Sequence, residues 1–386
     1  MKFKKKRSLL FISISIGLLA LFLFIKYLLP IDNKISNNVI VKNDEVTFKV
    51  DSKASLIMNL DTNQIIYQDN IDEALKVYSS SKILFLATIQ EEMVKNKISF
   101  NKKIRIGKNI NLINKNGNFS QSGIKTNEVY TIKELYYAIM MASGNDASIA
   151  LAEDIFGSHE QAVKAMNSFI KRHGLNNSKV ISTSGLDGED LSKAGLKTNK
   201  GSNVLSIRDT IKLIKIIEKN YPEIIEAGQL QQVKIGQYNK KELYINNVNG
   251  MIEAYSHIKG IYGLKTGSNM EDYSNSIINL YLNNHQQHFL IIIYGAHDYQ
   301  SMKKDTSQMI NYLNSLKVTN LVDNIDLDIK FGFNKNKVNY QLAHDLLIYY
   351  PQNEDLAYYL ENNNRHFNKF YNVKNKQIIG QIAFSN

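Results

Sequence analysis

A serine followed three positions later by a lysine recurs in this sequence and could pair a nucleophile with its base. A serine hydroxyl becomes a nucleophile only when a neighbouring base accepts its proton. Residues three apart lie on one face of a helix, so the amine can reach the hydroxyl. The pattern occurs six times, beginning at Ser79, Ser99, Ser122, Ser168, Ser256 and Ser301. Because it is so frequent, the context of each copy has to identify the functional one.

The copy at Ser79 differs from the others in the segment that follows it. Ser79-Ser80-Ser81-Lys82 opens the apolar run at residues 83–87. We therefore expect Ser79 at the N-terminus of a helix and Lys82 in a desolvated layer. Burial favours the neutral amine that a base requires, and the helix dipole favours negative charge near the serine oxygen. The competing interpretation is a serine-rich helix cap without a catalytic role.

Two later motifs carry an amide, a hydroxyl and a cation. Ser143-Gly144-Asn145 interrupts two helical patterns, which places its hydroxyl and amide on a short loop between helices. Lys265-Thr266-Gly267 occurs once and offers a cation and a hydroxyl to a carboxylate. Glycine in a strand lets another backbone or a ligand approach closely. Taken singly, each motif could also be an ordinary turn.

The order S-x-x-K, S-x-N, K-T-G is similar to the signature of the penicillin-recognising serine enzymes. The flanking residues resemble those of the D-alanyl-D-alanine carboxypeptidases, which are low-molecular-weight penicillin-binding proteins of bacterial cell walls. These flanking residues lie at 60–67, 143–147, 150–153, 184–187 and 262–267. The resemblance extends over about residues 46–316, and the end of the chain around residues 378–382 resembles the small second domain of that family.

The resemblance implies an acyl-enzyme mechanism that uses no cofactor and no metal. The catalytic residues that it implies are Ser79, Lys82, Ser143 and Asn145. Ser79 would attack the carbonyl between the last two D-alanines of a peptidoglycan stem peptide while Lys82 takes its proton. Ser143 and Asn145 would relay the proton to the leaving amine and hold the substrate amide. β-Lactam antibiotics would acylate the same serine and act as inhibitors.

The resemblance also implies how the substrate is bound. The substrate-binding residues that it implies are Lys265, Thr266, Gly267 and Ser268. Lys265 and Thr266 would bind the terminal carboxylate, and Lys265 would also help to keep Lys82 neutral. The backbone N–H groups of Ser79 and Ser268 would form the oxyanion hole, in which one donor stabilises the transition state by about 3–4 kcal/mol.

The sequence departs from the family pattern at three places. Val77-Tyr78 stands before the nucleophile where Pro-Ala is usual, and Ser268-Asn269 follows K-T-G where Tyr-Thr is common. An arginine that usually helps to bind the carboxylate after the last core strand has no counterpart at residues 294–300. Lys303 or Lys304 would have to replace it.

Two other functions remain open. A β-lactamase shares the fold and nucleophile but needs a deacylating base, often in a Glu-x-x-Leu-Asn segment, and the neighbourhood of residues 181–185 contains no such segment. A catalytically slow wall protein that binds penicillin or peptidoglycan is the second alternative. The unusual residues around K-T-G favour it, whereas the intact Ser79, Lys82 and Asn145 argue against it.

The N-terminus predicts a membrane anchor. Five positive residues lie within residues 2–7, and an uncharged run at residues 8–25 follows them. About 20 apolar residues span a bilayer as a helix, and the basic cluster should remain in the cytoplasm. The resemblance implies a bacterial source, and the catalytic body would then lie on the extracytoplasmic, cell-wall side. A cleaved signal peptide is the alternative, but no small-x-small cleavage site follows the run.

Composition excludes several classes of function. The chain has 386 residues and no cysteine, so it has no disulfide, no thiolate metal site and no cysteine nucleophile. None of its eight histidines forms an HExxH pair. The net charge is +11, but five of the positive residues precede the apolar run and the rest are diffuse, so we expect no nucleic-acid partner.

The chemical groups need a framework, and hydrophobic patterning predicts an α+β fold. Strands come first, helices lie in the middle, and a hairpin and a helix come last, which is typical of an antiparallel sheet completed by both ends of a domain and flanked by a helical cluster. The expected strands are 46–50, 55–60, 64–67, 276–282 and 288–295, and the expected helices are 83–94, 131–142, 158–173, 206–221 and 300–316. The expected organisation is an anchor at 1–30, a linker at 31–45, a penicillin-binding peptidase domain at 46–318 and a small all-β domain at 319–386.

Overall fold

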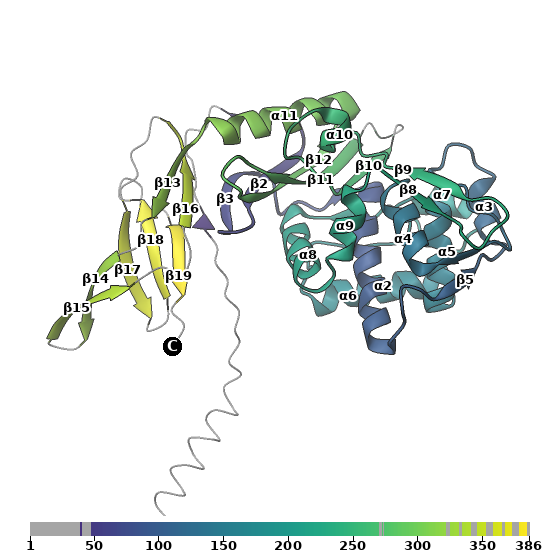
Figure 1. Cartoon of the computed structure of the whole chain (residues 1–386), viewed down its shortest axis with the longest axis horizontal. Coiled ribbons are helices and arrows are strands. Elements are labelled where there is room, and N and C mark those ends of the chain that lie inside the picture. Colours follow the sequence, from purple (N-terminus) through teal and green to yellow (C-terminus); the bar gives the residue numbers. More distant parts are fainter. Residues whose placement is uncertain are drawn as a thin grey trace, which may run out of the picture.

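The computed structural model describes most of the chain from residue 48 onward (Figure 1). The described residues are 39–40, 48–269, 272, 274–321, 325–331, 334–340, 346–352, 358–364, 367–372 and 378–383. Within these residues no helix is both long and apolar enough to cross a membrane. The anchor expected at residues 8–25 lies outside the described residues.

A six-stranded sheet forms the centre of the molecule. Its order is β1 (Val39–Ile40), β3 (Gln64–Asp69), β2 (Ala54–Asn59), β12 (His288–Ala296), β11 (Ser274–Leu282) and β10 (Lys265–Asn269). All neighbours are antiparallel except β1 and β3. The sheet therefore joins the first strands of the chain to the late β11–β12 hairpin, as the sequence pattern predicts.

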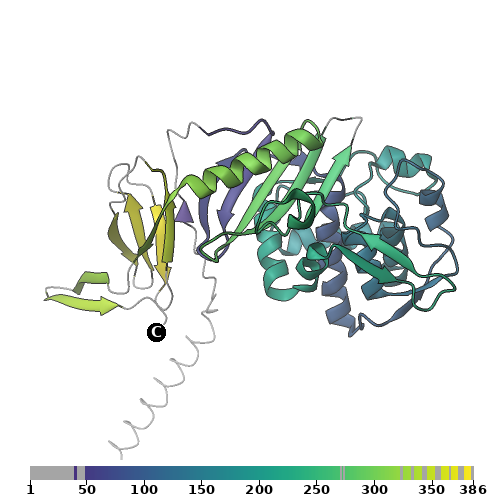
Figure 2. The ribbon, with the colours of Figure 1, turned by 45° about the horizontal axis from the view of Figure 1, so that its top comes forward.

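Helices cover both faces of this sheet, which explains why β2 and most of β11 and β12 are buried throughout. Helix α11 (Tyr299–Ser315) crosses one face of the sheet (Figure 2). Its Met302, Met309 and Leu313 pack against isoleucines of β2, β11 and β12. The helical cluster covers the other face. Strands buried on both sides lose the alternation of polar and apolar residues, and this produces the continuous apolar runs seen in the sequence.

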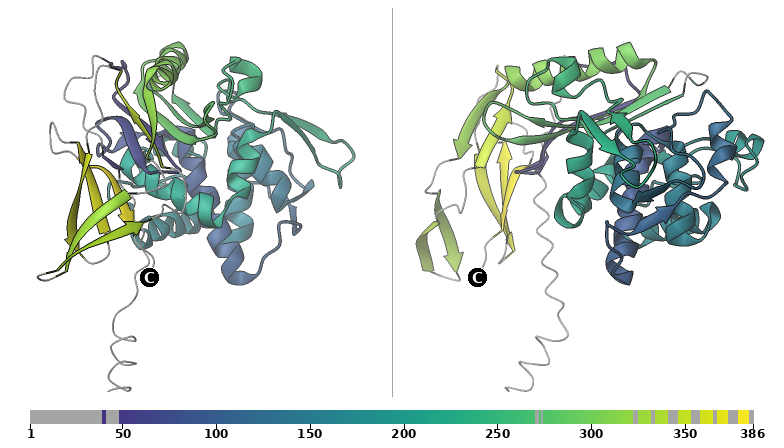
Figure 3. Two further views of the ribbon diagram at one scale, coloured as in Figure 1. Left: turned by 60° about the vertical axis from the view of Figure 1, so that its left-hand side comes forward. Right: turned by 45° about the vertical axis from the view of Figure 1, so that its right-hand side comes forward.

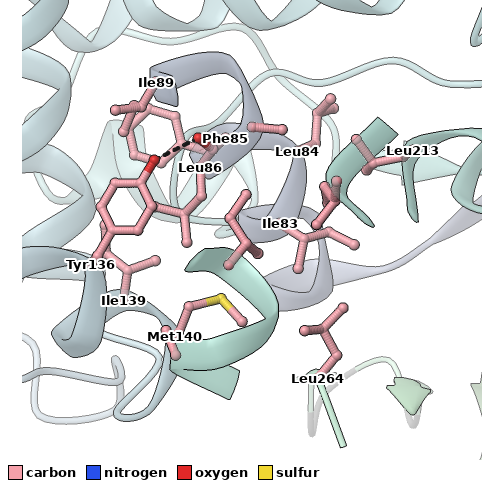
Figure 4. Packing of buried hydrophobic residues seen from close by; sticks show 14 of the residues in the cluster. Ile83, Leu84, Phe85, Leu86, Ile89, Tyr136, Ile139, Met140, Leu213 and Leu264 are labelled. Atoms are coloured by element: carbon pink, nitrogen blue, oxygen red, sulfur yellow. Dashed lines mark hydrogen bonds between the residues drawn. The ribbon is translucent and has the colours of Figure 1, made fainter. Parts of the chain in front are cut away.

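Helix α2 (Lys82–Asn96) lies at the centre of the helical cluster. Its first turns, from Ile83 to Ile89, are buried among side chains of neighbouring helices (Figure 4). The Tyr136 hydroxyl donates a 2.7 Å hydrogen bond to the Leu86 carbonyl. Burying each such aliphatic side chain stabilises the fold by about 1.5–3 kcal/mol, so α2 forms a rigid base for the residues at its N-terminus.

The structure describes eight further helices besides α2 and α11. The longer ones are α4 (Ile132–Met140), α5 (Asn145–Phe156), α6 (His159–Arg172), α8 (Ile207–Asn220) and α9 (Glu223–Gln229), and the shorter ones are α3 (Ile110–Asn114), α7 (Gly188–Lys193) and α10 (Glu253–Ser256). The predicted capping box at Thr131 and Glu134 is confirmed. Ser158 and Ser206 cap α6 and α8 through their side chains, which satisfies backbone N–H groups that the helix leaves without partners.

Short two-stranded ribbons connect the helices. They pair β4 (Leu75–Lys76) with β7 (Val204–Leu205), β5 (Lys103–Arg105) with β6 (Val129–Thr131), and β8 (Gln232–Ile235) with β9 (Leu243–Asn246). The β4–β7 pair is the one that matters for the site, because it holds the chain two residues before a 3-10 turn, η1 (Tyr78–Ser81).

The last part of the chain contains short antiparallel strands beside the β3 end of the sheet (Figure 3). They are β13 (Lys317–Leu321) with β16 (Leu346–Tyr350), β14 (Ile325–Phe331) with β15 (Asn334–Tyr340), and β17 (Tyr358–Asn364), β18 (Phe367–Asn372) and β19 (Ile378–Ala383). The Gln64 side chain joins the two regions, since it donates to the Tyr349 carbonyl at 2.7 Å and accepts from the Tyr349 N–H at 3.1 Å.

Two expectations require correction. Residues 48–50 of the predicted strand 46–50 are not in a strand. Instead, the Phe48 ring stacks on the ring of Tyr312 in α11 at a centroid distance of 4.6 Å. The hydrophobic residue at this position therefore reflects aromatic packing and not strand pairing. Within the expected linker 31–45, residues 39 and 40 form β1 beside β3. The proposed domain boundaries stay a prediction.

Candidate active site

Ser79 and Lys82 lie where the sheet meets the helical cluster. Ser79 is the second residue of η1, and Lys82 is the first residue of α2. Ser79 is partly exposed, whereas the Lys82 side chain is fully buried. The apolar helix that follows therefore places the lysine in the desolvated layer that the sequence predicts.

The Lys82 amine is surrounded by oxygen atoms. Its Nζ lies 2.8 Å from Ser79 Oγ, 2.8 Å from Asn145 Oδ1 and 2.5 Å from the Ser184 carbonyl, with Ser143 Oγ more distant at 3.4 Å. A neutral amine has two N–H donors and one lone pair. It can therefore donate to Asn145 and Ser184 while its lone pair accepts the Ser79 hydroxyl proton.

The surroundings of Lys82 favour this neutral form. Burial lowers the pKa of Lys82 well below its usual value, and the nearby charge of Lys265 lowers it further, against a weaker opposing effect of Asp146. Burial also lowers the pKa of Lys265, to about 7. Burial thus favours the neutral form of both lysines, and Lys82 has the properties of a general base.

The Ser143-Gly144-Asn145 loop joins α4 to α5 as expected. Ser143 has a φ of +55°, in the left-handed region that non-glycine residues seldom adopt. The buried Asp146 carboxylate supports this loop because it accepts hydrogen bonds from the Ser122 N–H, the Ser122 hydroxyl and the Gly123 N–H. This network fixes the start of α5 and thereby holds the Asn145 amide against Lys82.

The K-T-G motif forms the start of β10 at the edge of the sheet. The Lys265 side chain is buried, and its Nζ donates a 2.9 Å hydrogen bond to the Thr266 carbonyl. A Cβ on Gly267 would lie 2.2 Å from the Val77 carbonyl oxygen and 2.8 Å from the Ser80 N. Gly267 thus permits β10 to lie directly against η1, and this close approach gives the glycine of the motif its structural role.

A cleft of about 520 Å³ opens between η1, β10 and the Ser143 loop. Residues of all three motifs line it, namely Ser79, Ser143, Asn145, Thr266, Gly267 and Ser268. The structure therefore brings the eight predicted site residues together, with Lys82 and Lys265 buried beneath this lining.

The structure does not place the lysines expected to replace the missing arginine, Lys303 and Lys304, in the lining of the cleft. Lys304 forms an ion pair with Asp51 at 3.0 Å on the surface. Neither Lys303 nor Lys304 is among the described residues that line the cleft. Both lysines belong to α11, whose residues Tyr299 and Met302 reach the cleft instead.

Comparison with known proteins identifies the family. A model of the D-alanyl-D-alanine carboxypeptidase family matches residues 39–279. The chain belongs to this family. It is 30% identical over 217 residues to the D-alanyl-D-alanine carboxypeptidase DacF of Bacillus subtilis, which covers 56% of this chain and 51% of the relative. DacC of Escherichia coli is 29% identical over 143 residues, which covers 36% of this chain and 35% of the relative. The chain thus aligns with about half or less of the length of these relatives.

Solved structures of penicillin-binding proteins share the fold. The peptidoglycan synthesis regulatory factor PBP3 of Streptococcus pneumoniae matches with a TM-score of 0.69 and 19% identity, covering 87% of this chain and 99% of that chain. Penicillin-binding protein 5 of Haemophilus influenzae matches with a TM-score of 0.67 and 17% identity, covering 88% and 97%. These likenesses support the α+β penicillin-binding-protein fold.

Sequence patterns alone do not assign two features of this family member to the site. The Ser184 carbonyl accepts from Lys82, and Gly185, with a φ of +81°, lies so close that a Cβ would be 2.3 Å from the Tyr78 carbonyl oxygen. The Ser-Gly-Leu-Asp segment was visible as a family motif, but a backbone contact leaves no side-chain signal. The second feature is Asp272, which contacts Tyr78 and Lys76.

Proposed function

We propose that this protein is a serine D-Ala-D-Ala carboxypeptidase that removes the terminal D-alanine from peptidoglycan stem peptides. The observation that carries the proposal is the buried Lys82 amine, which lies 2.8 Å from both Ser79 Oγ and Asn145 Oδ1. The membership in the carboxypeptidase family supports the substrate class. β-Lactams would acylate the same serine.

In the acylation step, the Ser79 hydroxyl transfers its proton to neutral Lys82 as Oγ attacks the carbonyl carbon of the penultimate D-alanine. The negative charge that develops on the carbonyl oxygen is stabilised by the backbone N–H groups of Ser79 and Ser268. When the tetrahedral intermediate collapses, its C–N bond breaks. The proton then passes from Lys82 through the Ser143 hydroxyl to the leaving amine, and D-alanine departs.

Hydrolysis of the acyl-enzyme repeats these proton transfers in reverse. A water molecule gives its proton to Lys82, which is neutral again, and the resulting hydroxide attacks the ester carbonyl. Ser79 leaves with the proton held by Lys82, and the shortened peptide is released. Asn145 holds the substrate amide and orients Lys82 throughout, because its Oδ1 accepts a hydrogen bond from the amine.

The terminal carboxylate of the substrate is bound by Lys265 and Thr266. The pKa of Lys265 is about 7 because of burial, and a bound carboxylate favours the charged amine. The substrate carboxylate therefore pairs with the Lys265 ammonium and stabilises its charge in the buried site. Without the usual arginine, hydroxyl and backbone donors of β10 have a larger share in this recognition.

The penicillin and peptide reactions test this function together. Purified protein lacking the expected anchor at residues 1–30 should become covalently labelled by a fluorescent penicillin and should release D-alanine from a stem pentapeptide. Persistent label with D-alanine release supports the carboxypeptidase. Rapid loss of the label would instead indicate a β-lactamase, and labelling without D-alanine release would indicate a wall-binding protein. A pentapeptide ending in L-alanine is the matched control and should release no alanine.

We also propose that residues 8–25 anchor the enzyme in the bacterial membrane with the catalytic body on the cell-wall side. The support is the basic cluster followed by an uncharged run of sufficient length. Full-length protein should sediment with membranes and be cleaved by protease added outside spheroplasts. A secreted form that begins near Ile31 would contradict the anchor and show a cleaved signal peptide.

A further inference from the structure

Tyr78 stands directly before the nucleophile in a conformation that needs external support. Its φ is +47°, in the left-handed region, and its side chain is buried. Such a conformation costs free energy in a bulky residue and persists only where the surroundings hold it. The family commonly has a small residue at this position, which could not make the contacts that the tyrosine ring and hydroxyl make in this chain.

The Tyr78 hydroxyl donates a hydrogen bond to Asp272 Oδ2. The same carboxylate oxygen forms an ion pair with Lys76 Nζ at 2.7 Å. The Asp272 N–H donates a hydrogen bond to Asn269 Oδ1 at 3.2 Å. Asp272 lies between β10 and β11, and Lys76 belongs to β4. The carboxylate thus links the segment before the nucleophile to the turn that follows the K-T-G strand.

The backbone of Tyr78 is fixed at the same time. Its carbonyl accepts a 2.6 Å hydrogen bond from the Ser81 hydroxyl, and Gly185 packs against this carbonyl and against the Ser79 N. With the backbone held on one side and the phenol on the other, rotation of the peptide between Tyr78 and Ser79 is restricted. That peptide carries the Ser79 N–H, one of the two proposed oxyanion donors.

We propose that Tyr78 and Asp272 form a clasp between η1 and the turn after β10 that aligns the Ser79 and Ser268 N–H groups on the substrate carbonyl oxygen. The clasp is defined as the hydrogen bond between the Tyr78 hydroxyl and the Asp272 carboxylate. Tyr78 is therefore a positioning residue for acylation and takes no part in proton transfer. This inference rests on the proposed acylation of Ser79.

The clasp does not titrate in the working range of the enzyme. Burial, and then the bond to Asp272, raise the pKa of Tyr78, and the nearby Asp187 raises it further. The bonds from Lys76 and Tyr78 lower the pKa of Asp272, and the charges of Lys76 and Lys53 act in the same direction. Near neutral pH the tyrosine stays protonated and the aspartate stays ionised. Removing the clasp should therefore lower the acylation rate without moving its pH dependence.

Tyr78→Phe tests the clasp when acylation by a fluorescent penicillin is resolved into a binding constant and a first-order acylation rate. We expect the acylation rate to fall about 10–100-fold, as for a small misplacement of reacting groups, with little change in binding or melting temperature. Asp272→Asn keeps an acceptor and should lose less. The double variant Tyr78→Phe/Asp272→Ala should be no slower than Asp272→Ala alone, because both changes break one bond.

Tyr130→Phe is the matched control, because the Tyr130 hydroxyl also donates to a carboxylate, Glu128 Oε2, at 2.7 Å, and neither residue lines the cleft. It should leave the acylation rate unchanged. Equal rates in wild type and Tyr78→Phe would overturn the clasp while leaving the proposed function intact. A shift of the pH profile in Tyr78→Phe would also contradict a purely positioning role. Failure of the wild type to label would overturn both proposals.

Discussion

Ser79→Ala should abolish covalent labelling by penicillin and release of D-alanine while the protein stays folded. The change removes only the hydroxyl group of the residue, and no acyl-enzyme can form without it. Loss of the nucleophile from a catalytic group commonly costs several orders of magnitude in rate. Labelling on a denaturing gel measures the effect directly, and a thermal melt that matches the wild type excludes unfolding as its cause.

Ser99→Ala and Ser301→Ala are suitable controls because both serines begin the same S-x-x-K pattern. Ser99 Oγ accepts a local turn hydrogen bond from the Asn101 N–H, and Ser301 lies in the first turn of α11. Neither contacts Lys82 among the described hydrogen bonds. Both variants should label like the wild type. Penicillin labelling that survives in Ser79→Ala, or labelling that is lost in both controls, would contradict the assignment of Ser79 as the nucleophile.

Lys265→Ala should slow acylation and shift its pH dependence. Losing a charge-assisted hydrogen bond to the carboxylate costs about 1.5–3 kcal/mol, which is about one to two decades in rate. The rate rises with pH as Lys82 loses its proton. Burial lowers the pKa of Lys82 first, and repulsion by Lys265 lowers it further. Removing Lys265 therefore raises the pKa of Lys82, and the rise in rate should move to higher pH.

The single-turnover acylation rate across pH 5 to 10 measures both effects of this variant. Lys265→Arg keeps a positive charge but presents a planar group where an ammonium fits, so recovery should be partial. Lys304→Ala is the control, since Lys304 pairs with Asp51 on the surface, and it should behave like the wild type. An unchanged rate in Lys265→Ala would mean that other groups bind the carboxylate. A slower acylation rate with an unshifted pH profile would contradict only the proposed effect of Lys265 on the pKa of Lys82.

The sequence predicts the core of the fold because burial leaves a strong local signal. The first half of helix α2 is apolar on nearly all sides, the hairpin of β11 and β12 is a pair of apolar runs, and Thr131 marks its helix by a capping box. The strand expectation was wrong at residues 48–50, the part of 46–50 that the structure describes, because periodicity cannot distinguish strand pairing from the stacking of Phe48 on Tyr312.

Parts of the site escape such reasoning because they depend on backbone atoms and distant contacts. The carbonyl of Ser184 approaches Lys82 across 102 positions of the chain, and no side-chain pattern records this. Tyr78 appears in the sequence as a departure from the family, but only the structure shows its partner, Asp272, 194 positions away. Similarly, the sequence suggests Lys304 as a replacement for the missing arginine, but only the structure shows that Lys304 is paired with Asp51.

Mass spectrometry of the penicillin adduct tests the central claim most directly. Trypsin should release Ser79 in the peptide of residues 77–82, VYSSSK, and fragmentation separates its three serines. The account predicts a single penicilloyl group on Ser79, because Ser80 and Ser81 are fully buried while Ser79 lines the cleft. An adduct on any other residue, or no adduct on folded protein, would contradict the assignment of Ser79 as the nucleophile.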